Sequence, residues 1–153
     1  MAAMNRLGAL AAIAAAACGG DNEEPIAGDV AIGYGDETIT PTVGAALDSG
    51  DGDPNKALVV IGTRGVSCET TNASNLRKGT YLTFTIDRVV GSQSPFVSVI
   101  RIDSGSAHLN GSAGQVTIDA IEDRVTGSVV VDTSDAEIGA ISAAGTFDVV
   151  RCF

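Results

Sequence analysis

Apolar and polar residues alternate along many short stretches of this chain, and this period of two predicts β-strands. The alternation is clearest where Leu82, Phe84 and Ile86 share one face and polar residues occupy the other. Eight segments alternate in this way or are wholly apolar, and turn-forming residues bound each of them. The predicted strands are Asp29–Tyr34, Glu37–Thr42, Lys56–Gly62, Thr80–Val90, Phe96–Asp103, Gly114–Ile121, Arg124–Val131 and Gly145–Cys152.

About eight short strands at this spacing predict an all-β fold, a single antiparallel β-sandwich or small barrel. The one helical candidate in the domain, Val43–Leu47, is too short to predict a helix. Pro41 cannot donate a ladder hydrogen bond, so its segment is expected at a sheet edge. The pair Asn110-Gly111 predicts a type I′ hairpin turn, and residues 121–124 predict a second reversal.

The N-terminus is typical of a secretory signal peptide, with Arg6 before an apolar stretch at Leu7–Ala17. A membrane-spanning helix needs roughly 20 apolar residues, so a signal helix is favoured. The small residues before Cys18 resemble a lipobox, the motif whose cysteine receives a diacylglycerol in bacterial lipoproteins. The resemblance implies a lipid anchor on Cys18. Ala15–Ala17 also satisfies the A-x-A pattern of ordinary secretion, which would release a soluble protein.

Cysteine parity bears on this choice. The chain has three cysteines, and an odd number in an exported protein leaves one unpaired. Acylation of Cys18 leaves Cys68 and Cys152, which are predicted to form one disulfide in an oxidising compartment. The alternative, a redox-active thiol, lacks the Cys-x-x-Cys spacing.

The chain is therefore expected to contain a signal peptide at residues 1–17, a lipidated cysteine and flexible tether at 18–28, and a β-domain at 29–153. Without the signal, 153 − 17 = 136 residues are left, enough for one domain with its own core. The formal charge is −10, from 9 Lys+Arg and 19 Asp+Glu. So acidic a chain repels nucleic acid, and no nucleic-acid partner is expected.

An acidic loop places side-chain oxygens at Asp51, Asp53 and Asn55, the alternate positions that a calcium loop uses. An EF-hand would have Gly where Lys56 stands and Glu where Gly62 stands. The loop is therefore interpreted as an acidic turn with no metal, and a weak calcium site is the alternative.

His108 is the chain's single histidine, and no G-x-S-x-G nucleophile motif is present. We expect His108 to be exposed beside the predicted Asn110-Gly111 turn. The chain is accordingly expected not to be an enzyme and to need no cofactor. An unrecognised hydrolase and a calcium-stabilised adhesion-type domain are the alternatives.

The later half of the chain resembles the ending of many small uncharacterised bacterial lipoproteins. In those, a G-T-F-x-V-x-x-C strand, here Gly145–Cys152, follows a V-T-G-x hairpin, here Val125–Ser128. The resemblance implies a β-sandwich and carries no catalytic residues. The chain is thus predicted to be a lipid-anchored module of the bacterial cell envelope, at the outer membrane, with secretion as the alternative. Its expected role is binding, with a protein or glycan as the unknown ligand, or envelope structure.

Overall fold

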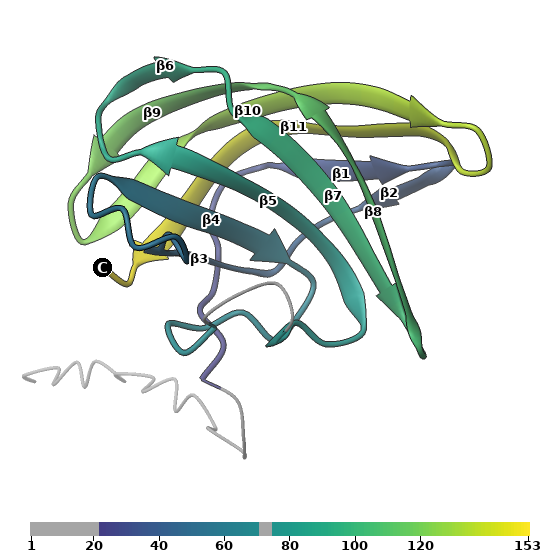
Figure 1. Cartoon of the computed structure of the whole chain (residues 1–153), viewed down its shortest axis with the longest axis horizontal. Coiled ribbons are helices and arrows are strands. Elements are labelled where there is room, and N and C mark those ends of the chain that lie inside the picture. Colours follow the sequence, from purple (N-terminus) through teal and green to yellow (C-terminus); the bar gives the residue numbers. More distant parts are fainter. Residues whose placement is uncertain (1–21, 71–74) are drawn as a thin grey trace, which may run out of the picture.

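The structure is a computed structural model that describes residues 22–70 and 75–153. These residues form one sheet curled into a half-barrel (Figure 1). No helix in this part of the chain is long and apolar enough to cross a membrane. The eleven strands of the described residues are β1 (Ala31–Tyr34), β2 (Glu37–Ile39), β3 (Val43–Asp48), β4 (Lys56–Gly62), β5 (Gly79–Asp87), β6 (Gly91–Gln93), β7 (Phe96–Asp103), β8 (Ser106–Ala113), β9 (Gln115–Ile121), β10 (Arg124–Asp135) and β11 (Gly139–Arg151).

The sheet has the strand order β6-β9-β10-β11-β3-β4-β5-β7-β8. Strand β11 is long enough to take β1 and then β3 as successive neighbours along one edge, with β2 beyond β1. Every pairing is antiparallel except that of β11 with β3. The all-β prediction is confirmed, but the strands form one mixed sheet instead of two packed antiparallel sheets. The alternation of apolar and polar residues shows which face of a strand is buried. It does not show which strands pair with it, because pairing depends on residues far apart in the sequence.

One segment that the sequence left unassigned is a strand, and one predicted turn is not a turn. The helical candidate Val43–Leu47 lies in β3. Small residues there let β3 pack closely against β11, because a Cβ on Gly44 would lie 2.8 Å from a side-chain carbon of Val149. Asn110 and Gly111 lie inside β8, and the chain instead reverses at Ser104-Gly105, where Gly105 has a φ of +89°. A glycine adopts this left-handed conformation without strain, so Gly105 provides the turn.

Two other predictions are confirmed. Residues 121–124 connect β9 and β10 as a hairpin, with Ile121 paired to Val125. Pro41 follows β2, which pairs only with β1 and therefore forms an edge of the sheet. The missing amide hydrogen of proline is thus placed where it interrupts no ladder.

The main hydrophobic core fills the inner, concave side of the curl. Leu82, Phe84 and Ile86 are buried there as the alternation predicts. Phe84 meets Phe147 of β11 edge to face, with ring centroids 5.6 Å apart. A smaller cluster on the outer side of the same strands includes Tyr81, whose hydroxyl donates a hydrogen bond to the Arg77 carbonyl at 2.8 Å.

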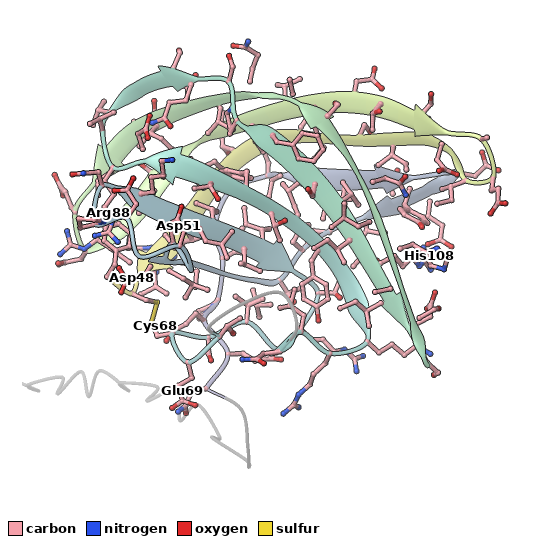
Figure 2. All side chains as sticks on the ribbon, viewed as in Figure 1. Asp48, Asp51, Cys68, Glu69, Arg88 and His108 are labelled. Atoms are coloured by element: carbon pink, nitrogen blue, oxygen red, sulfur yellow. A yellow bond between two sulfur atoms is a disulfide. The ribbon has the colours of Figure 1, made fainter. Side chains whose placement is uncertain are left out.

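The outer cluster is covered by the described parts of the segment between β4 and β5, residues 63–70 and 75–78. Val66 and Leu76 of this segment are buried in the cluster. Cys68 of the same segment forms a disulfide with Cys152, with an S–S distance of 2.05 Å and Cα atoms 5.3 Å apart. The predicted bridge is therefore confirmed, and it ties the covering segment to the chain's C-terminal end (Figure 2).

The segment before β1 is held against the sheet. The Glu24 amide donates to the Val66 carbonyl and its carbonyl accepts from Gly44, both at 2.9 Å. Ala27 and Asp148 exchange backbone hydrogen bonds at 2.8 and 3.0 Å. The end of the predicted tether thus belongs to the folded domain. The predicted signal peptide at residues 1–17 and Cys18 lie outside the described residues.

Candidate functional site

A polar cleft opens at one end of the half-barrel, between the β1–β2, β7–β8 and β10–β11 hairpins. Figure 2 shows His108 at this end, far from Asp48, Asp51 and Arg88 at the other. The cleft has a volume of about 420 Å³. We call it the His108 cleft; its lining residues are Tyr34, Gly35, Glu37, Arg101, Asp103, His108, Asp135, Glu137 and Ile138.

Arg101 is the central cation of the His108 cleft. It lies directly across the β7–β8 ladder from His108, and its Nη1 donates to Glu37 Oε2 of β2 at 2.7 Å. The guanidinium also lies 5.0 Å from the centre of the Tyr34 ring, a cation–π contact. The hydrogen bond from Arg101 to Glu37 raises the pKa of Arg101, and burial raises the pKa of Tyr34. Arg101 is therefore charged and Tyr34 neutral at physiological pH.

The remaining carboxylates make the cleft acidic. Asp135 holds the β10–β11 turn, because its Oδ1 accepts from the amides of Glu137 at 2.8 Å and Ile138 at 3.1 Å. With Glu37 neutralised by Arg101, the side chains of Asp103, Asp135 and Glu137 leave the cleft with an excess of negative charge. Such a cleft suits a polar or cationic group and disfavours an anion.

His108 is exposed, as predicted, although it stands within a strand and not beside a turn. Within the described residues, no hydrogen bond joins it to a hydroxyl or carboxyl group that it could activate. An activated nucleophile requires such a base within hydrogen-bond reach. Among the described residues, His108 is thus not paired with a nucleophile.

A second hollow, of about 500 Å³, lies on the outer side of β5 and β7. Its lining includes exposed Phe96 and the hydroxyls of Thr83 and Ser98, with charges only from Lys56 and Asp87. It brings together fewer titratable groups than the His108 cleft, so we place the candidate site at the cleft.

The carboxylates of the acidic loop, Asp51 and Asp53, already interact with other groups of the same loop. Asp51 Oδ1 accepts from the Ser49 hydroxyl at 2.5 Å and from the Asp53 amide at 3.1 Å. The hydrogen bond from Ser49 is the main reason that the pKa of Asp51 is lowered. Asp53 Oδ1 accepts from the Asn55 amide at 2.9 Å, and its Oδ2 lies 4.0 Å from Lys56 Nζ. Among the described residues, no three His, Cys, Asp or Glu side chains are arranged to hold a metal ion.

We expect calcium to leave the melting temperature unchanged, because the loop oxygens already accept hydrogen bonds and Lys56 adds a positive charge. Thermal unfolding is measured in chelator and in millimolar calcium, for the wild type and for the double variant Asp51→Ala, Asp53→Ala. A ligand that binds the folded state raises its stability. If calcium raised the melting temperature of the wild type but not that of the variant, the calcium-site alternative would be restored.

The sequence predicted an exposed His108 but assigned it no role, and it did not single out Arg101, Glu37 or Tyr34 as residues of a site. One signal was available: Val97 and Val99 of β7 are inward, and the same alternation puts Arg101 on this apolar face. A charged residue on the inner face of a strand is unusual and points to a partner or a site. Comparison with known protein families, curated proteins and solved structures found no match to the chain.

Proposed function

We propose that this chain is a lipid-anchored, non-enzymatic module of the bacterial cell envelope, attached to the membrane through Cys18, with a binding or structural role. The observation that carries the proposal is the disulfide between Cys68 and Cys152. Disulfides persist in extracytoplasmic compartments, so the bond supports export. It also uses two of the three cysteines and leaves Cys18, which follows the lipobox-like sequence, as the odd one.

The start of the domain supports a short anchor. Among the described residues, Glu24 is the first whose backbone bonds to the sheet, and residues 19–23 separate it from Cys18. Six residue steps of at most about 3.5 Å would hold Glu24 within about 21 Å of the acylated cysteine. The domain would then stay close to the membrane surface.

The His108 cleft supports a binding role for this module. It gathers residues from three hairpins, and its one strong cation is committed to Glu37. The Arg101 guanidinium and the Tyr34 ring are thus held in fixed positions, and fixed groups of this kind favour specific binding of one ligand. The ligand class that fits an acidic cleft of this kind is a polar or cationic group of a protein or glycan.

We expect the full chain, purified from membranes of a bacterial host, to begin at Cys18 and to carry added acyl mass in intact-mass spectrometry. Cys18→Ser should leave the membrane fraction, because no acyl acceptor is left. The double variant Cys68→Ser, Cys152→Ser is the matched control and should stay at the membrane. A mature wild-type N-terminus without acyl mass would show that the anchor does not exist and would favour simple secretion.

A further inference from the structure

We infer that two copies of this chain associate edge to edge through β8. Among the described strands, the sheet ends at β6, β8 and, on its branch, β2. Strands β6 and β2 have three residues each, whereas β8 has eight. Long edge strands are commonly protected by lysine, proline or a bulge, and β8 has none of these. Apart from its C-terminal end, which lies against β10, it therefore offers a row of backbone donors and acceptors to another strand.

The turn before β8 determines which backbone groups are available. Asp103 and Ser106 flank a two-residue turn and form a hydrogen-bonded pair. Along β8, residues whose backbone bonds to β7 therefore alternate with residues whose backbone faces away from β7. Ala107, Leu109 and Gly111 then direct their amide and carbonyl groups to the free edge. A two-fold axis at Leu109 sets Leu109 opposite Leu109 of the second copy and Ala107 opposite Gly111, in antiparallel register.

The side chains around this axis are apolar on the outer face of the sheet. Leu109 is 61 % exposed, and Phe96 of β7, which pairs with Ala113 further along β8, is 60 % exposed. Gly111 lies under the Phe96 ring, because a Cβ at this position would be 2.8 Å from a ring carbon. Pairing of two copies places the Leu109 side chains against each other and shields the neighbouring rings. On the inner face, His108 comes opposite Asn110 of the second copy.

Charge favours a second copy as the occupant of this edge. The chain carries a net charge of −10, so most of its surface repels another copy. Strand β8, with the sequence Ser-Ala-His-Leu-Asn-Gly-Ser-Ala, has no charged residue when histidine is neutral. Symmetric pairing therefore sets no like charges opposite each other, which would destabilise a pair of strands. A charged peptide would find no opposite charge on this strand.

The first test is Leu109→Cys in the full chain, produced in a bacterial host and treated with copper phenanthroline. Opposed residues of a hydrogen-bonded pair have Cα atoms about 5.5 Å apart, within reach of a disulfide. We expect a disulfide-linked homodimer on non-reducing gels. A reductant should convert it back to the monomer. Val130→Cys on β10 is the matched control, since Val130 is similarly exposed at 54 %, and we expect no dimer from it.

The second test is Leu109→Lys in the full chain extracted in detergent, measured by light scattering after size exclusion. Two lysines at the two-fold axis should raise the dimer dissociation constant at least about tenfold, since opposed like charges are strongly unfavourable. Val130→Lys should leave it unchanged. A wild type that stays monomeric, equal cross-linking at positions 109 and 130, or a Leu109→Cys adduct with a different protein would each overturn the inference.

Discussion

The double variant Cys68→Ser, Cys152→Ser is expected to lose about 4 kcal/mol of unfolding free energy, because the bridge closes a loop of 84 residues. Such a crosslink restricts the unfolded chain most when the loop is long. Replacing both residues avoids a lone thiol that could pair between molecules. Urea unfolding at fixed pH measures the difference, and a loss below about 1 kcal/mol would contradict the expectation.

In the folded state of the double variant, local opening should be most frequent in the segment that covers the outer cluster. Val66 and Leu76 are buried by this segment, and Cys68 is its covalent link to the end of the sheet. The Cys152 amide still donates to the Ala46 carbonyl at 2.9 Å, so the C-terminal end keeps its place without the bridge. Hydrogen exchange should therefore speed up around Val66 before it does so in β4 and β5. Wild type treated with reductant is the control and should show the same pattern.

What the sequence predicted well is local or covalent. The inward face of β5 follows from alternation alone, because successive side chains point to opposite sides of a strand. Leu82, Phe84 and Ile86 are buried accordingly. The bond between Cys68 and Cys152 follows from parity, since only two cysteines are left once Cys18 is assigned elsewhere. Neither prediction needs the order of the strands.

What the sequence did not predict depends on residues far apart. Strand β11 takes the parallel neighbour β3 through Val150 and Ala45, and no local pattern encodes this pairing. Asn110-Gly111 has the composition of a tight turn, but the register of β7 with β8 keeps it inside a strand and leaves the reversal to Gly105. Tertiary pairing thus overrides a local turn preference.

The His108 cleft could not be predicted for the same reason. Its contact between Arg101 and Glu37 joins β7 to β2 across 64 positions of sequence. The three hairpins that form the cleft come together only because the sheet curls. From the sequence, alternation in β7 places Arg101 on the apolar face, but no local pattern identifies Glu37 as its partner.

The curl itself depends on a large residue packed beside a very small one. Phe147 of β11 is fully buried and pairs across the ladder with Gly127 of β10. The register of β10 against β9 shifts at this glycine, as in a β-bulge. A Cβ on Gly127 would lie 2.2 Å from the Thr117 carbonyl oxygen and 3.1 Å from the Phe147 ring. The missing side chain therefore lets the strands bend inward, and the Phe147 ring fills the space inside the bend.

Phe147→Ala is accordingly expected to lower the free energy of unfolding by about 3 to 5 kcal/mol, the range for removing a buried aromatic ring. The variant loses the edge-to-face contact with Phe84 and leaves a cavity where the strands bend, which they cannot close without breaking the β10–β11 ladder. Phe96→Ala makes the same truncation at an exposed ring and should lose less than about 1 kcal/mol in the same urea titration. Equal losses in the two variants would mean that the inner face of the curl is not the main source of stability.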